Sequence, residues 1–188
     1  MKRVLTTLAL LLSVTLTSQA QNPAVSFWNN LQKHCGLAYE GTLELPKDDT
    51  AFGGKRLVMH IRSCSPTQIK VPFFVGDDKS RTWIFTLKNG VITLKHDHRH
   101  KDGSEDDVTQ YGGTASNAGS ATMQVFPADQ FTASLLPRAA TNVWSVSLAE
   151  TAFSYNLNRV NNNSVFKVVF DLTQPIETPE TPWGWEEQ

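Results

Sequence analysis

The fold is decided by the stretch Arg81–Tyr111, RTWIFTLKNGVITLKHDHRHKDGSEDDVTQY, in which two turn signals separate alternating runs. The first signal, Asn89-Gly90, is typical of a type I′ hairpin, because both central residues of that turn need positive φ. With these two residues as the loop, each residue of the first strand has a defined partner on the second. The predicted pairs are Arg81–His98, Trp83–His96, Phe85–Leu94, Leu87–Ile92 and Lys88–Val91.

One face of this hairpin is apolar and the other is polar. Cross-strand partners share a face, so the apolar face is expected to point into the core. Arg81, His96 and His98 lie on that same face, toward one end. The apolar members are Trp83, Phe85, Leu87, Ile92 and Leu94.

The second turn signal, Asp102-Gly103, predicts another hairpin directly after the first. A loop of even length places Asp107 opposite His98, and Tyr111 opposite Leu94. The predicted core face then carries three rows, from the end of the barrel inward. They are Arg81, His98 and Asp107; then Trp83, His96 and Thr109; then Phe85, Leu94 and Tyr111.

The core face therefore changes from apolar to ionisable toward one end. Buried charges are costly unless they are paired, so such a cluster either satisfies itself or binds a ligand. The leading hypothesis is a site for a small, partly apolar molecule with a polar or anionic head group. Its candidate ligand-binding residues are Arg81, Trp83, His96, His98, Asp107 and Tyr111.

Two other functions stay open for the same residues. His96, His98 and His100 alternate along one strand, which spaces their side chains about 6.5–7 Å apart and allows a shared Zn or Cu ion, with Asp107 or Glu105 as a further ligand. A His98–Asp107 pair could also serve as the general base of a hydrolase or isomerase. No nucleophile or oxyanion motif accompanies it, so no catalytic residue is assigned and a binding protein is favoured over an enzyme.

The rest of the chain reads as short strands after one helix. Phe27, Trp28 and Leu31 are spaced as on an amphipathic helix, predicted over 25–34. The β-branched and aromatic runs that follow are separated by Gly, Asn, Asp, Pro or Ser clusters. We expect an all-β antiparallel up-and-down barrel of about eight to ten strands, with a β-sandwich as the alternative.

The N-terminus indicates export. Residues 1–20 have a basic start, an apolar run and small residues before Ala20, which is the layout of a signal peptide cleaved after Ala20. The protein is thus expected to be periplasmic or secreted. In an oxidising compartment, Cys35 and Cys64 are expected to form a disulfide rather than a metal pair or a catalytic thiol.

Composition limits the partners and the domain count. A chain of 188 residues with a net charge of −1 fits one domain, here 21–174, and excludes binding of nucleic acid through a basic field. No run after the signal peptide is long enough to span a membrane. Residues 175–188 form an extended acidic tail with Trp183 and Trp185, for which a free end is favoured over docking on the barrel or on a partner.

The pattern as a whole resembles the calycin (lipocalin-like) architecture, through its leader, its short helix with Trp28, its Cys pair and about ten strands. The segments His34-Cys35-Gly36, Arg81-Thr82-Trp83 and His96–Gly103 also resemble a group of uncharacterised exported bacterial proteins. That resemblance implies export and carries no activity. No ligand position follows from it.

Overall fold

One sheet accounts for most of the regular structure in residues 22–185, the part of the chain that this computed structural model describes. The predicted leader lies outside that range. The strands are β1 (Ala38–Leu45), β2 (Leu57–His60), β3 (Ser63–Cys64), β4 (Gln68–Val75), β5 (Asp78–Lys88), β6 (Val91–His98), β7 (Tyr111–Thr114), β8 (Met123–Pro127), β9 (Asn142–Leu148), β10 (Ala152–Arg159) and β11 (Ser164–Ile176).

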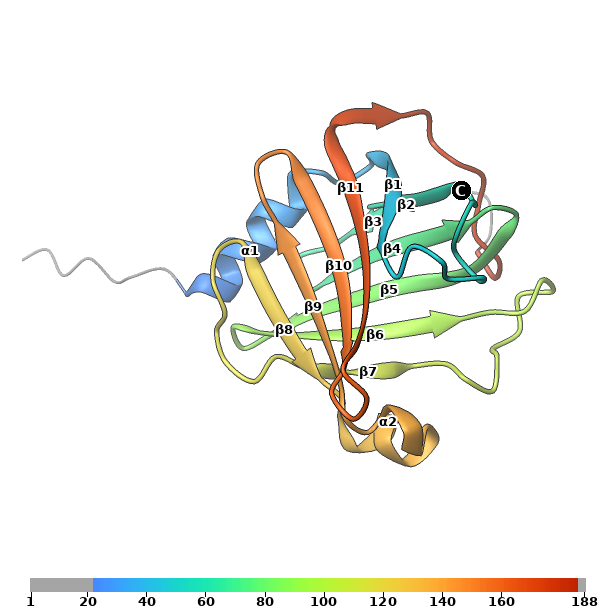
Figure 1. Cartoon of the computed structure of the whole chain (residues 1–188). Helices are drawn as coiled ribbons and strands as arrows, with labels where there is room; N and C mark the ends of the chain where they lie inside the picture. Colours follow the sequence, from blue (N-terminus) through green and yellow to red (C-terminus); the bar gives the residue numbers. More distant parts are fainter. Residues whose placement is uncertain (1–21, 186–188) are drawn as a thin grey trace, which may run out of the picture.

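The strands form a nearly closed antiparallel barrel (Figure 1). Their order is β7-β6-β5-β4-β2-β1-β11-β10-β9-β8, and the short β3 pairs with β4 off this path. Most neighbours in the barrel are neighbours in the chain, and β1 pairs with β11 to join the two ends of the meander. The predicted all-β up-and-down barrel is confirmed, and the alternative of a sandwich is not what forms.

The barrel has a seam between β7 and β8, where the described residues form no backbone ladder. The side chain of Thr132, on the short helix α2 (Gln130–Leu135), bridges this gap by accepting from the Gly112 N–H at 2.7 Å and donating to its carbonyl at 2.8 Å. A Cβ at Gly113 would lie 1.7 Å from the Pro127 carbonyl oxygen. Only glycine therefore permits the two strands to approach so closely.

The helix α1 (Pro23–Gln32) packs at one end of the barrel (Figure 1). Asn22 caps it by accepting from the Ala24 N–H at 2.9 Å, and proline fits the first helical position because it needs no N–H donor there. The helix was predicted two residues later along the chain. Its buried side chains are Ala24, Phe27, Trp28 and Leu31, and it packs against β6, β8 and β9.

The predicted Cys35–Cys64 disulfide is confirmed, and it joins the chain just after α1 to β3.

No helix of the described chain combines the length and the apolar character that crossing a bilayer demands.

The β5–β6 hairpin has the predicted register. Arg81 pairs with His98 and Trp83 with His96, and the turn residues Asn89 and Gly90 have φ of 53° and 75°. Because the loop has two residues, His96 and His98 lie opposite inward-facing residues of β5, and both imidazoles point to the core side.

The next pairing differs from the prediction. Arg99 bridges to Glu105, one residue from its predicted partner, and the His100 N–H donates to the Ser104 carbonyl, which leaves a three-residue loop of 101–103 in place of an even one. Residues 106–110 form no strand, and Gln110 has a φ of 58° before β7 begins. His96 then pairs with Tyr111, two residues from its predicted partner. A shift of two preserves the side-chain parity, so Tyr111 stays on the inner face, opposite His96 rather than Leu94.

The C-terminal tail is docked as far as the structure describes it. The Trp183 N–H donates to the Lys79 carbonyl at 3.2 Å, and the Lys70 ammonium lies 5.1 Å from the centre of the Trp185 ring. The favoured free end is therefore wrong for this segment, because the tail contacts the strands β4 and β5.

Candidate functional site

A cavity of about 380 Å³ lies at the end of the barrel away from α1. Its lining comes from both halves of the barrel and from the loops around its mouth. Five of the six predicted ligand-binding residues line it, namely Arg81, Trp83, His96, His98 and Tyr111. The structure therefore brings these five together, as the alternation in the sequence indicated.

Aromatic rings form much of the cavity wall. Trp83 stacks on Phe73 with the ring centroids 4.8 Å apart, and on Tyr155, from the opposite side of the barrel, at 4.4 Å. Tyr111 stacks on His96 at 4.6 Å, and the buried Trp144 lies 5.2 Å from the same imidazole. These packed rings give the cavity a stable apolar wall.

The hydrogen bonds of His96 fix its tautomer. Its Nδ1 lies 3.0 Å from the Tyr111 carbonyl oxygen, which can only accept, so Nδ1 carries the proton. Its Nε2 then accepts from the Tyr155 hydroxyl at 2.6 Å. Burial lowers the pKa of His96 to about 3, so this imidazole is neutral at ordinary pH.

His98 and Tyr111 extend this network toward the mouth. The Nε2 of His98 lies 3.0 Å from the Tyr111 hydroxyl. Burial lowers the pKa of His98, with the nearby Arg81 guanidinium acting in the same direction, and burial raises the pKa of Tyr111 to about 12. The two imidazoles and the phenol therefore contribute hydrogen-bonding groups to the site at neutral pH and no full charge.

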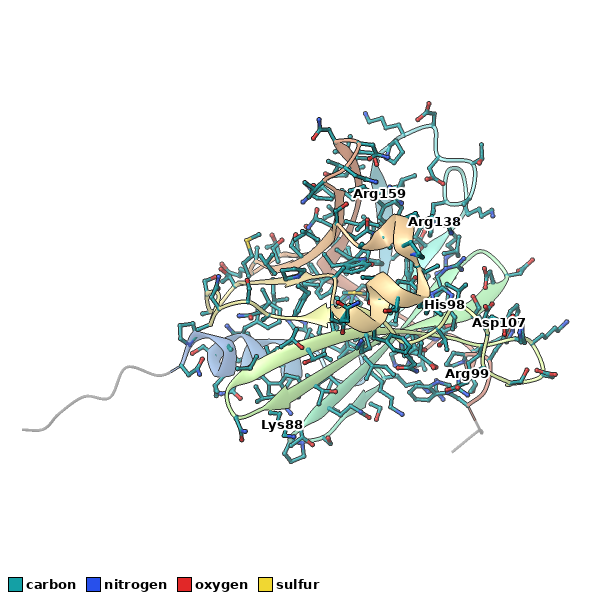
Figure 2. All side chains as sticks on the ribbon, turned by 90° about the horizontal axis from the view of Figure 1, so that it is seen from below. Lys88, His98, Arg99, Asp107, Arg138 and Arg159 are labelled. Carbon is teal, nitrogen blue, oxygen red and sulfur yellow. A yellow bond between two sulfur atoms is a disulfide. The ribbon has the colours of Figure 1, made fainter. Side chains whose placement is uncertain are left out.

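Three arginines contribute positive charge to the cavity lining, namely Arg81, Arg138 and Arg159. Arg81 forms an ion pair with Asp78 at 2.5 Å, while Arg138 and Arg159 form none with any residue that the structure describes. Among residues 22–185, the lining holds no aspartate or glutamate. Figure 2 shows Arg138 and Arg159 on the same side of the molecule as His98.

One buried polar group in the wall has no partner. Asn142, at the start of β9, lines the cavity and is only 7% exposed. Its Oδ1 accepts no hydrogen bond from any described residue. Buried carbonyl oxygens are almost always satisfied, so this atom is an exception, and it is enclosed by protein rather than open to the cavity.

Asp107 does not reach the site. It lies exposed on the loop between β6 and β7 (Figure 2), and the carbonyl of His98 accepts from the N–H of Asp106 instead. The predicted opposition of His98 and Asp107 is wrong because the loop is odd in length. The proposed general-base pair for a hydrolase or isomerase therefore lacks its carboxylate.

The three histidines predicted to share a metal ion do not face one common space. His96 is buried with both ring nitrogens hydrogen-bonded, His98 is largely buried, and His100 is exposed beyond the end of β6. Within residues 22–185, no three His, Cys, Asp or Glu side chains gather into a group that could hold a metal ion. The geometry gives the Zn or Cu hypothesis no support.

Sequence reasoning missed Tyr155, Arg159, Arg138 and Asn142 as site residues. Two of them had a signal: Tyr155 and Arg159 continue the alternation of Phe153 and Leu157 on β10, which places all four on one face. Arg138 lies on the 3₁₀ turn η1 (Pro137–Ala139), and no period in the sequence marks it.

The Tyr155–His96 bond is expected to stabilise the fold. Replacing Tyr155 by Phe leaves the buried Nε2 of His96 without a donor, which should cost about 1–3 kcal/mol of unfolding free energy in urea titrations. Tyr39→Phe is the matched control, since its hydroxyl bonds His34 at 2.8 Å, where the imidazole is only partly buried and water can replace it. Equal losses in both variants would contradict a special role for the buried pair.

Comparison with protein-family models, with curated proteins and with solved structures finds no match for this chain. The cavity itself is therefore the basis for a functional proposal.

Proposed function

We propose that the protein is an exported small-molecule-binding barrel that takes a partly apolar ligand into the cavity lined by Trp83, Trp144 and Tyr155. The observation that carries this proposal is the cavity of about 380 Å³ with an aromatic wall and a polar, arginine-bearing mouth. Ligand sites of small molecules have this composition, and their volumes begin at roughly 300 Å³.

Two features of the chain support the proposal. The neutral His96–Tyr155 pair holds the wall rigid, so little ordering is needed when a ligand binds. The Cys35–Cys64 disulfide is compatible with an oxidising compartment and so with export.

A substitution at the mouth tests the proposal. Val108 lines the cavity and is 36% exposed on the β6–β7 loop, so Val108→Trp should narrow the entry and leave stability within about 0.5 kcal/mol. We expect this variant to bind N-phenyl-1-naphthylamine, a neutral fluorescent aromatic probe, at least about tenfold more weakly than the unmodified protein, a change of about 1.4 kcal/mol.

The matched control is Val91→Trp, which makes the same change at an exposed valine at the α1 end of the barrel. Its probe affinity should equal that of the unmodified protein. Absence of saturable binding to the unmodified protein, or equal affinities for all three proteins, would overturn the proposal.

A further inference from the structure

We infer that the ligand of this cavity is an organic anion, whose carboxylate, sulfonate or phosphate group is bound at the mouth by Arg138 and Arg159 together with Arg81. This inference deepens the proposed function and rests on it. It concerns the charge of the ligand, which an aromatic cavity alone would leave unspecified.

The charge balance of the lining is the first argument. Three guanidinium groups line one cavity to which the described part of the chain contributes no carboxylate, in a protein whose net charge is only −1. The positive charge is thus local to the mouth rather than a general property of the protein. Guanidinium groups bind carboxylates and phosphates with paired N–H donors, which makes arginine the preferred residue for such anions.

The state of the three arginines is the second argument. Arg81 is held by Asp78 at 2.5 Å and lies over the Phe52 ring, with its guanidinium carbon 5.6 Å from the ring centre. Arg159 donates only to the Ser164 hydroxyl at 3.4 Å, and neither it nor Arg138 has a carboxylate partner within residues 22–185. Two guanidinium groups at the entrance therefore keep donors for a ligand.

The neutral imidazoles are the third argument. Since burial keeps His96 and His98 uncharged at neutral pH, the positive charge of the lining comes from the three arginines. Asp78, Asp97 and Asp106 act on His98 from outside the lining. An apolar body can enter among the rings while the anionic group remains at the partly solvated mouth, where its desolvation is small.

A pair of probes that differ by one anionic group tests the inference. These probes are 1-anilinonaphthalene-8-sulfonate and its uncharged parent, N-phenyl-1-naphthylamine, both of which fluoresce strongly when bound in apolar surroundings. We expect the sulfonate to bind the unmodified protein more tightly. In Arg138→Gln/Arg159→Gln its affinity should fall roughly tenfold or more, because charge-assisted hydrogen bonds are lost, while the affinity for the neutral probe should change less than about twofold.

The control variant is Lys33→Gln/Lys88→Gln, which removes the same charge from two exposed lysines outside the cavity lining. Lys33 is the C-cap residue of α1. Lys88 lies at the turn that carries Gly90, whose carbonyl accepts from Asn22, and so belongs to the same end of the barrel (Figure 2). The affinity of this variant for the sulfonate should stay within about twofold of the unmodified protein, since exposed charges are screened beyond about 10 Å.

The outcomes separate the two proposals. Binding of both probes with equal affinity, or an equal loss for both in the arginine variant, would overturn the anion inference and leave the binding function standing. A loss for the sulfonate that the lysine control reproduces would also overturn it, since net charge alone would then explain the effect. Failure of both probes to bind the unmodified protein would reject the binding function and the anion inference together.

Discussion

Between pH 7 and pH 4 the protein is expected to lose about 3 kcal/mol of unfolding free energy through His96 alone. Burial lowers the pKa of this imidazole to about 3 in the folded state, while in the unfolded chain it titrates near its ordinary value of 6.5. Between these two values the unfolded chain binds a proton that the folded protein does not bind. Stability therefore falls as the pH falls through this window and is fully present above it.

Urea titrations at several pH values between 7 and 4 measure this loss. The His96→Gln variant should be less stable than the unmodified protein at pH 7, because two buried hydrogen bonds are altered. Its unfolding free energy should also depend less steeply on pH. His100→Gln is the control, since His100 is exposed and the variant should show the same dependence of unfolding free energy on pH as the unmodified protein. Parallel pH profiles for the unmodified protein and His96→Gln would contradict the assignment.

Removal of the Cys35–Cys64 disulfide is expected to cost about 3–4 kcal/mol of unfolding free energy. The bond closes a loop with a sequence separation of 29, and opening it restores that loop's conformational entropy to the unfolded chain. The double variant Cys35→Ser/Cys64→Ser should show this loss in urea titrations under non-reducing conditions.

A reductant provides the control for that measurement. It should lower the stability of the unmodified protein to about that of the double variant, and it should leave the variant itself unchanged. A loss below about 1 kcal/mol, or sensitivity of the variant to reductant, would show that loop closure is not the source of the stability. The bond lies near α1, so the variant that still folds should keep its affinity for the aromatic probes.

The part of the fold that local rules govern was predictable. Asn89-Gly90 determines its own turn, and the two-residue loop fixes every pair of the β5–β6 hairpin. The Asp102-Gly103 turn is less restrictive, because a glycine there fits loops of several lengths. The three-residue loop and the non-strand residues 106–110 therefore moved Asp107 out of the site and kept Tyr111 in it.

The part of the site that depends on barrel closure was not predictable in the same way. Tyr155 and Trp83 stack across the interior although β10 and β5 are far apart in the sheet order. Their contact depends on how the whole sheet curls, which no local pattern encodes. Arg138 reaches the mouth from a turn next to α2. That helix has only six residues, too few for a helical spacing of apolar residues to be recognised in the sequence.

The position of α1 closes one end of the barrel. Phe27, Trp28 and Leu31 fill the far end of the barrel, and the cavity lies toward the end that carries the arginines. Under the proposed binding function, a ligand enters and leaves at the end of the barrel that carries the arginines, so a bound ligand blocks the entry of the next one.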